Sequence, residues 1–503
     1  MIACTLIAPN TPSGQTSEGG AWGALSEAFA LRSPFRYTRL MRVYLESLGC
    51  RLNYAEMFAL GRQLADAGHT LAPSVEGADV CVLNSCAVTG EAARKSRQIL
   101  RQMARNNAVA RLVVTGCYAT LEGERLAALP DVALVVGNAR KQALLGIIEE
   151  FAPAESPLAR PRVAAIAATD LVSSVGRTRA FVKVQDGCRN RCTFCLVTVA
   201  RGEERSRTIR DVVDEVQRLG ADGYQEIVLT GVHLGGYGRD LGADLSSLVD
   251  ALISDTDILR LRLSSLEPFD LSPAFFTLWE RAGGRSSAGG GRLMPHLHLP
   301  AQSGSDVVLK RMARRNSVSD FEELAAEARA RIPGVTITTD IIVGFPGEAE
   351  AELEESLAFA RRVGFAHLHI FPYSARAGTA AARFSGRVPE TERRRRSRLM
   401  NEVGEELGVI VRREFLGQTR PVLFESFQLL APTDPSVGAG QSSRGTQDVI
   451  WSGLTDNYLR VLVHAPAGAD LHNRILPKRL LGLAGANLLG QIESEDWSTG
   501  VSR

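Results

Sequence analysis

The sequence lacks long apolar runs, a secretion signal and a strong net charge, and each absence narrows the possible classes of protein. No stretch approaches the roughly 18 consecutive apolar residues that a membrane-spanning helix needs. The N-terminus has no basic segment followed by an apolar core, so we expect no signal peptide, a cytoplasmic location and no membrane partner. The formal net charge of +2 neither indicates nor excludes a nucleic-acid partner.

Cysteine occurs eight times in 503 residues. In a reducing compartment, these cysteines are expected to be metal ligands or buried thiols rather than disulfides. Hydrophobic residues make up 45% and charged residues 23%, as in an ordinary globular protein, and the length predicts about three domains. Residues 1–40 show no clear period and are interpreted as a flexible leader or an upstream start, so the first domain is expected to begin at Met41.

The segment from 41 to 153 alternates strand-like and helix-like patterns. The runs RVYLES, DVCVLN, RLVVTG and ALVVG predict strands of a doubly wound parallel sheet, an α/β fold. Cys50, Cys86 and Cys117 follow the first three of these strands. Because ligands of such sheets sit beyond the carboxyl ends of strands, the three cysteines are expected to converge on one iron–sulfur site. The alternative is three unrelated buried thiols, as expected for Cys81 inside a strand.

A second series of strands and helices follows a linker at 152–176 that is rich in Pro, Ala and Ser. Six repeats between 174 and 408 predict an open, partial (β/α)6 barrel with its chemistry at the carboxyl ends of the strands. The strands are expected at FVKVQD, EIVLTG, RLRLSS, HLHLP, TITTDIIVG and HLHIFPY. The Gly-rich stretch at 283–292 is interpreted as a flexible insertion.

The first strand of this barrel is followed by Cys188, Cys192 and Cys195, with the spacing C-x3-C-x2-C. Three thiolates hold a 4Fe–4S cluster and leave its fourth iron without a protein ligand, which makes that iron a place for chemistry. Structural zinc normally takes four ligands, commonly as two C-x2-C pairs, and the chain has no second pair. The spacing therefore favours an iron–sulfur cluster over zinc.

The C-terminal part begins with a helix expected at about 390–414, followed by short strand patterns. These patterns predict a small β-barrel at 411–482 and a tail at 483–503, with a long loop at 429–446. Such barrels bind oligonucleotides or brace the core. If the barrel binds RNA, the arginines of 393–398 are the expected phosphate contacts, and Trp451 and Tyr458 are the expected base contacts.

The cysteine run with Phe194 before its last cysteine resembles the radical S-adenosylmethionine (SAM) superfamily. Together with the N-terminal cysteines and the small C-terminal β-domain, it resembles the methylthiotransferases over nearly all of residues 41–480. The resemblance implies a methylthiotransferase N-terminal domain, a radical SAM core and a TRAM barrel. Finer runs, namely VLNSCAVTGEAARKSRQILR, RAFVKVQDGC, TGVHLGGYG and RLRLSSLEP, resemble the branch that acts on N6-threonylcarbamoyladenosine at tRNA position 37.

This resemblance implies two 4Fe–4S clusters and SAM as cofactors. The cluster on Cys188, Cys192 and Cys195 would cleave SAM to a radical that removes hydrogen from C2 of adenine, and the auxiliary cluster on Cys50, Cys86 and Cys117 would carry sulfur. A second SAM would supply the methyl group. The implied partners are the tRNA anticodon loop, an electron donor such as a flavodoxin or ferredoxin, and a sulfur donor. The alternatives are methylthiolation of isopentenyladenosine tRNA or of a ribosomal protein, and a non-catalytic iron–sulfur sensor that binds RNA.

Five further residues are candidates for contact with SAM because they follow strands of the barrel: Gly231, Gly235, Gly236, Glu267 and Gln302. The glycines have a plain turn as their alternative. His296 and His298 share a face of one strand and are left unassigned, because such histidines are more often packed than catalytic.

Two further features bear on the core. The basic run of Arg311, Arg314 and Arg315 is interpreted as a solvated helix face. Thr198 and Val199 stand where the family often has Pro-Tyr, which is expected to alter pocket packing but to leave the cysteine ligands in place.

Overall fold

The computed structural model describes residues 40–87, 89–151, 178–282, 291–429, 449–466 and 468–492. Predictions that concern the leader before residue 40, the linker, most of the Gly-rich stretch, the loop at 430–446 and the last residues of the tail lie outside these ranges. No described helix is long and apolar enough to cross a membrane.

The N-terminal domain is a five-stranded, all-parallel sheet with the strand order β2-β1-β3-β4-β5. Its strands are β1 (Arg42–Ser47), β2 (Thr70–Leu71), β3 (Val80–Ser85), β4 (Arg111–Gly116) and β5 (Val132–Val136). Its helices are α1 (Arg51–Asp66), α2 (Gly90–Asn106), α3 (Cys117–Leu121), α4 (Gly123–Ala127) and α5 (Leu144–Phe151). The predicted doubly wound fold is confirmed, and its central strand β3 is buried along its whole length.

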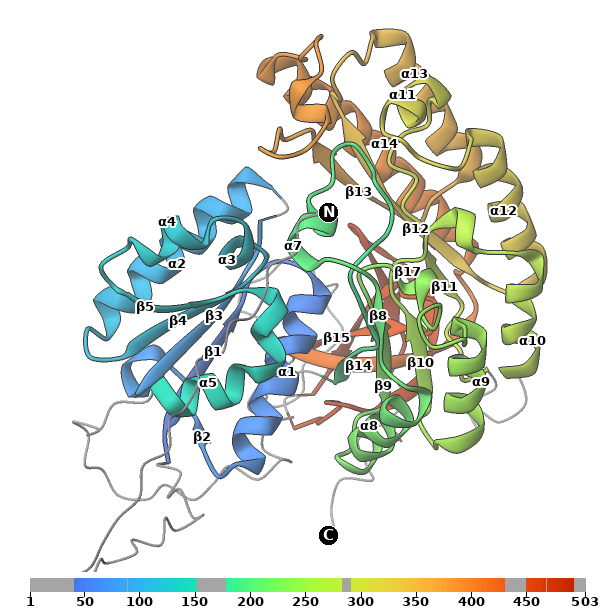
Figure 1. The fold of residues 1–503 in the computed structure, drawn as a ribbon. Helices are drawn as coiled ribbons and strands as arrows, with labels where there is room; N and C mark the ends of the chain where they lie inside the picture. Colours follow the sequence, from blue (N-terminus) through green and yellow to red (C-terminus); the bar gives the residue numbers. More distant parts are fainter. Residues whose placement is uncertain are drawn as a thin grey trace, which may run out of the picture. The chain divides into compact units, whose positions relative to one another are not determined.

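Helices cover both faces of this sheet (Figure 1). Apolar side chains of α1 and α5, such as Leu64 and Ile148, pack against one face. Side chains of α2, α3 and α4, such as Leu100, Tyr118 and Leu126, pack against the other. Since both faces are covered, the strands read as continuous apolar runs, as parallel sheets require.

The central domain contains two three-stranded parallel sheets, in the orders β10-β9-β6 and β11-β12-β13. Their strands are β6 (Arg179–Lys183), β9 (Glu226–Thr230), β10 (Arg260–Leu263), β11 (His296–His298), β12 (Thr336–Val343) and β13 (His367–Pro372). Two parallel bridges, Leu261 with Leu293 and Ser265 with His298, join the sheets. The predicted open barrel of six parallel strands is therefore confirmed.

Helices connect the strands of this barrel and cover its outside (Figure 1). They are α7 (Val197–Arg201), α8 (Ile209–Ala221), α9 (Leu245–Asp255), α10 (Thr277–Ala282), α11 (Asp306–Arg311), α12 (Val318–Arg331) and α13 (Glu350–Val363). A short antiparallel ribbon of β7 (Gln185–Asp186) and β8 (Arg205–Ser206) brackets the cysteine loop. The ribbon fixes both ends of that loop.

The C-terminal domain is a closed β-barrel in the order β14-β15-β16-β18-β17. Its strands are β14 (Thr419–Leu429), β15 (Val449–Thr455), β16 (Arg460–Ala465), β17 (Ile475–Ala484) and β18 (Asn487–Gly490). The barrel therefore extends to Gly490 rather than ending at 482 as predicted, because β18 pairs with both β16 and β17 to close it. The short β18 lacks a strand signal that stands out in the sequence.

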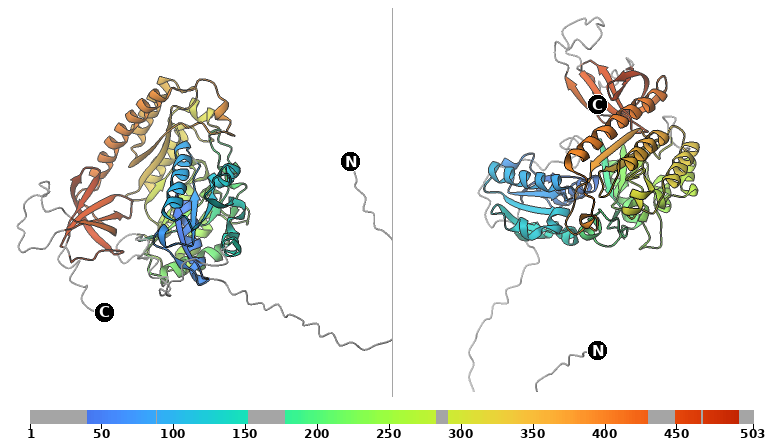
Figure 2. Two further views of the ribbon diagram at one scale, coloured as in Figure 1. Left: turned by 90° about the vertical axis from the view of Figure 1, so that its left-hand side faces the viewer. Right: turned by 90° about the horizontal axis from the view of Figure 1, so that it is seen from above.

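Helix α14 (Glu390–Glu414) joins the two barrels (Figure 2). Its middle residues, such as Met400 and Leu407, lie in the core of the central domain. Val411, near its end, lies in the core of the C-terminal barrel with Phe424. The predicted helix is confirmed, and its apolar side chains bury surface against both domains.

Candidate active site

The N-terminal cysteines lie at the carboxyl ends of three neighbouring strands. Cys50 precedes α1, Cys86 follows β3, and Cys117 is the first residue of α3. Strand order places β1, β3 and β4 side by side, so the three loops lie at one edge of the sheet, and the convergence of their sulfurs on one site stays a prediction. Cys86 and Cys117 are buried and Cys50 is exposed. Cys81 is buried inside β3, which confirms it as a core thiol, and burial raises its pKa to about 12.

Two glycines allow these loops to approach each other. A Cβ at Gly49 would lie 2.7 Å from Cys86 Sγ, and one at Gly116 would lie 2.3 Å from the carbonyl oxygen of Ser85. Both glycines have a positive φ, +107° and +100°, which residues with a side chain rarely adopt. The glycine of LGC before Cys50 therefore leaves room for the Cys86 side chain, and the glycine of TGC before Cys117 leaves room for the backbone of Ser85.

The core cysteines lie on the loop between β7 and α7. The backbone N–H of Asn190 donates to Cys188 Sγ at 3.4 Å, and that of Val197 donates to Cys195 Sγ at 3.4 Å. Nη1 of Arg314 lies 3.9 Å from Cys192 Sγ. Each sulfur thus has a donor directed at it, as suits thiolates that carry negative charge when bound to iron.

Burial keeps these thiols protonated when they bind no metal. It raises the pKa of Cys188 to about 11 and that of Cys195 to about 12. It also raises the pKa of Cys192, although the Arg314 guanidinium opposes the shift. Since iron binds the thiolate, loading the site must release these protons. The three sulfurs, each with a hydrogen-bond donor directed at it, form a set of ligands that fits an iron–sulfur cluster.

Arg314 connects Cys192 to the predicted cofactor residue Glu267. Its Nη2 lies 2.5 Å from Glu267 Oε2 and donates to the carbonyl oxygen of Pro300 at 2.7 Å. The Arg314 side chain is only 1% exposed, so the prediction of a solvated basic run is wrong at this position. Sequence spacing gave no signal for this role, because Glu267 and Pro300 lie on other strand ends.

Two of the three predicted cofactor glycines pack against a buried hydrogen-bond network. A Cβ at Gly235 would lie 2.6 Å from the Asp270 carboxylate, and one at Gly236 would lie 2.9 Å from Glu204 Oε1. His233 Nδ1 lies 2.7 Å from Glu204 Oε1, and its Nε2 bonds Asp270. Gly235 and Gly236 therefore have a packing role. A Cβ at Gly231 would lie 3.0 Å from Gln185 Oε1. Contact of these three glycines with SAM stays a prediction.

His233 supports the cysteine loop through Asn190, whose Nδ2 lies 3.4 Å from His233 Nε2. Burial alone would lower the pKa of His233, but hydrogen bonds with Asp270 and Glu204 raise it above its ordinary value. This histidine is not among the residues predicted from the sequence. It stands inside the run TGVHLGGYG, between the glycines that were considered.

A cavity of about 210 Å³ is bordered by one cysteine from each triad. Its wall includes Cys117 from the N-terminal triad and Cys195 from the core triad. Gln302, the last predicted cofactor residue, also lines it, with Asp340 and Phe371. Gln302, four residues after the end of β11, adopts a left-handed backbone with φ of 72°, which residues other than glycine rarely adopt. One cysteine of each triad therefore borders the same space.

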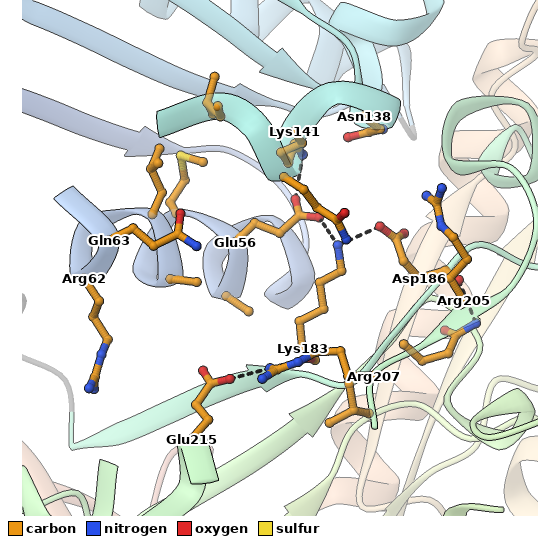
Figure 3. A pocket seen from close by; sticks show the side chains of 18 of the residues that line it. Glu56, Arg62, Gln63, Asn138, Lys141, Lys183, Asp186, Arg205, Arg207 and Glu215 are labelled. Carbon is orange, nitrogen blue, oxygen red and sulfur yellow. Dashed lines mark hydrogen bonds and ion pairs between the residues drawn. The ribbon is translucent and has the colours of Figure 1, made fainter. Parts of the chain in front are cut away.

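A buried ion-pair network joins the N-terminal domain to the core. Glu56 of α1 accepts from Arg201 of α7 at 2.8 Å, from Lys183 at 2.8 Å and from Lys141 at 2.6 Å. Asp186 shares Arg201 and Lys183. Figure 3 shows both lysines pointing at Glu56 beside a second cavity of about 440 Å³. The network holds α1, next to Cys50, against the helix that follows Cys195.

The network also fixes the ionisation of its central carboxylate. Burial alone would raise the pKa of Glu56, but Arg201, Lys141 and Lys183 together hold it well below its usual range. Asn138 of the N-terminal domain adds an uncharged contact with α7, because its Nδ2 donates to the carbonyl oxygen of Ala200 at 2.8 Å. The same Nδ2 lies 3.7 Å from Cys117 Sγ.

The two residues that depart from the family pattern lie on α7. Thr198 Oγ1 donates to the carbonyl oxygen of Asn190 at 3.1 Å and so supports the core cysteine loop. Val199 is 64% exposed. All three core cysteines lie on the loop before this helix, so neither residue replaces a predicted cluster ligand.

The predicted RNA contacts are partly wrong. Arg396 is buried and pairs with Glu348 at 2.8 Å, and Arg395 pairs with Glu350, so these guanidiniums are used within the protein. Arg398 of the same run is exposed.

The predicted stacking aromatics are also occupied. Trp451 is buried in the C-terminal barrel and donates from Nε1 to the carbonyl oxygen of Ala469 at 3.1 Å. The Tyr458 ring stacks on His296 at 4.6 Å, and the guanidinium of Arg262 lies 4.8 Å from its centre. The prediction that these two rings stack on bases is therefore wrong. Strand periodicity does not reveal which aromatic of a small barrel faces inward.

Two family models match the chain. Residues 42–137 match a family described as uncharacterized protein family UPF0004, and residues 182–360 match the radical SAM superfamily. The open parallel barrel with three cysteines after its first strand thus defines a radical SAM enzyme, to which a parallel-sheet domain with a second triad is joined.

Curated relatives narrow the family. The chain is 34% identical over 449 residues to threonylcarbamoyladenosine tRNA methylthiotransferase MtaB of Bacillus subtilis, covering 87% of this chain and 93% of that one. It is 35% identical over 384 residues to the protein of the same name from Thermotoga maritima, covering 76% and 86%. It is 31% identical over 415 residues to tRNA-2-methylthio-N(6)-dimethylallyladenosine synthase of Staphylococcus haemolyticus, covering 80% and 78%.

The chain belongs to the radical SAM methylthiotransferase family. It is an enzyme that uses SAM and a 4Fe–4S cluster. The resemblance predicted from the cysteine spacing is therefore confirmed.

Proposed function

We propose that this enzyme methylthiolates C2 of N6-threonylcarbamoyladenosine at position 37 of tRNA. The observation that carries the proposal is the cavity of about 210 Å³ bordered by one cysteine from each triad. A base held there is close to both triads at once, as the transfer of sulfur to a carbon activated at the other site requires.

In this proposal, Cys188, Cys192 and Cys195 hold the cluster that binds SAM, and Cys50, Cys86 and Cys117 hold a second 4Fe–4S cluster that carries sulfur. With SAM bound, the first cluster supplies one-electron cleavage of the sulfonium bond and a 5′-deoxyadenosyl radical. The donors on each core sulfur and the Arg314 guanidinium stabilise the negative charge of this site.

The chain itself orients the base and excludes water. The cavity wall is largely apolar, with Phe194, Leu196, Ile342 and Phe371 among its residues. Removing hydrogen from C2 of adenine needs no general base, because that position has no acidic proton. An apolar wall suits a radical, which a polar, wet site would expose to side reactions.

The choice of tRNA substrate rests on the relatives and on the quoted sequence runs. Relatives named for threonylcarbamoyladenosine are 33% to 36% identical, and those named for dimethylallyladenosine are 30% to 32% identical. Dimethylallyladenosine tRNA is therefore the second candidate substrate. A flavodoxin or ferredoxin as electron donor and a separate sulfur donor complete the proposal.

The substrate is tested with the reconstituted enzyme under anaerobic conditions. It is incubated with SAM, a reductant and tRNA that carries either threonylcarbamoyladenosine or dimethylallyladenosine at position 37, and the nucleosides are measured by mass spectrometry. We expect 2-methylthio-threonylcarbamoyladenosine from the first tRNA and at most a trace of product from the second. Product from the dimethylallyl tRNA alone would reject the substrate assignment.

A further inference from the structure

A cluster of imidazoles and one carboxylate lies beside the cavity, on the strands β11, β12 and β13. His298 Nε2 lies 3.4 Å from Asp340 Oδ1. The rings of His298 and His369 meet edge to face, with centroids 5.4 Å apart. One ligand-type atom from each of these three residues lies within 4.8 Å of the others. The proposed reaction assigns no role to this cluster of His298, Asp340 and His369.

Strand register shows how the cluster relates to the cavity. Asp340 pairs with His369 across β12 and β13, and Ile342 pairs with Phe371 two residues further along. Since alternate residues of a strand share a face, His369 and Phe371 lie on the same face of β13. Asp340 and Phe371 line the cavity, so the cluster stands next to it, about 7 Å along the strand from the Phe371 level.

The exposed ring of Phe371 offers a surface for a base. Phe371 is 41% exposed, although it is a large apolar side chain at the edge of the cavity. Bases that are drawn out of a loop commonly stack on aromatic side chains. In adenine, C2 and the carbon that bears N6 flank the same ring nitrogen. A base with its C2 at the cysteines therefore carries its N6 substituent only a short distance away.

The two candidate substrates differ in that substituent. Threonylcarbamoyl carries a urea, a hydroxyl and a carboxylate, whereas dimethylallyl is a hydrocarbon. The cluster offers imidazole donors and acceptors. Burial, followed by the neighbouring His367 and His298, lowers the pKa of His369 to about 4 against the opposing charge of Asp340, so His369 is neutral and offers both a donor and an acceptor.

We propose that His298, Asp340 and His369 form the subsite that recognises the threonylcarbamoyl group, with Phe371 stacked on the adenine. This inference rests on the proposed function, because it assigns the contacts that select one tRNA over another. A site that hydrogen-bonds a polar group rejects a substrate that lacks it far more strongly than an apolar pocket rejects an extra methylene. The polar cluster thus favours threonylcarbamoyladenosine and leaves its own groups unpaired with a hydrocarbon.

The test compares His369→Phe with the wild type. His369 is half-buried and its replacement keeps a ring of similar size. Dissociation constants are measured for tRNA with threonylcarbamoyladenosine and for the same tRNA with unmodified adenosine. We expect the wild type to prefer the modified tRNA by about tenfold or more, and His369→Phe to lose this preference. KM for the modified tRNA should rise in parallel.

Two further variants define the result. His369→Gln retains hydrogen bonding and should restore most of the preference, whereas a merely structural role of the ring would not be rescued. His464→Phe makes the same change at an exposed histidine of β16 and should match the wild type in Kd and in iron content.

Three outcomes would overturn the inference or its basis. An unchanged Kd ratio in His369→Phe, with product still formed on threonylcarbamoyl tRNA, rejects the subsite and leaves the proposed function intact. A wild type that modifies only dimethylallyl tRNA rejects the proposed function itself. A stoichiometric metal other than iron that is lost in His369→Phe would assign the cluster to metal binding instead.

Discussion

At the scale of the residue, the Arg314 side chain contacts three separate segments of the site. Its guanidinium contacts Cys192 Sγ, the Glu267 carboxylate and the carbonyl oxygen of Pro300. These three groups come from the cysteine loop and from the ends of two barrel strands. A positive charge beside a cysteine ligand stabilises the more negative, reduced form of a cluster, because reduction adds an electron.

Arg314→Gln should therefore slow reductive cleavage of SAM without unfolding the protein. We expect the rate of 5′-deoxyadenosine formation to fall roughly 10- to 100-fold, as is typical when a group that contacts a metal ligand is removed. The midpoint potential of the core cluster, followed by EPR, should become more negative. Arg315→Gln, at the exposed neighbouring position, is the matched control. Equal rates in both variants would show that Arg314 only fills space.

The sequence predicted the cysteines of this site but not the residues around them. Cys50, Cys86 and Cys117 follow strand patterns that are visible locally, so their convergence was predictable from the rules of parallel sheets. Arg314 and Trp451 were misread because their surroundings depend on partners far away in the chain. A charge run reads the same whether its guanidinium faces water or a carboxylate 47 residues distant.

At the scale of elements, the decisive contact is between α1 and α7. Glu56 sits on α1, and Arg201 is the last residue of α7. The two helices begin next to Cys50 and shortly after Cys195, so their pairing fixes the distance between the triads. Buried ion pairs contribute little net stability, but removing one partner leaves an uncompensated charge.

Glu56→Gln should destabilise the protein by about 3–5 kcal/mol at neutral pH, since it leaves Lys141 without its carboxylate partner and Arg201 and Lys183 with Asp186 alone. The pKa of Glu56 is lower in the folded than in the unfolded state. Its contribution is therefore complete above the unfolded pKa of about 4.3 and is lost as pH falls toward the folded value. Urea unfolding at pH 7.5 and below about pH 3 should show a smaller difference between the variant and the wild type at acid pH.

Glu322→Gln is the matched control, because it makes the same change in an exposed ion pair with Arg362. It should cost at most about 1 kcal/mol at either pH. A loss in Glu56→Gln no larger than this would contradict the role assigned to the network.

Elements were predicted more completely than their ends and faces. Both α/β domains follow from apolar runs that alternate with amphipathic segments. Strand β18 was missed, because Asn487–Gly490 is short and gains its strand form only by closing the barrel. The sequence did not predict the recognition role proposed for His369 on β13, because its neighbours His298 and Asp340 come from β11 and β12.

At the scale of the molecule, the two triads belong to different domains but border one cavity. Neither domain alone contains both walls of that cavity, since Cys117 comes from the N-terminal sheet and Cys195 from the core barrel. In the proposed function, the core triad activates the base and the N-terminal triad supplies the sulfur.

This division is tested most directly by replacing Cys50, Cys86 and Cys117 together with alanine and measuring two products in one reaction. With SAM, reductant and threonylcarbamoyl tRNA, the wild type should form both 5′-deoxyadenosine and the 2-methylthio nucleoside. The triple variant should still form 5′-deoxyadenosine but no methylthio nucleoside. Methylthio product from the variant at the wild-type rate would contradict the account.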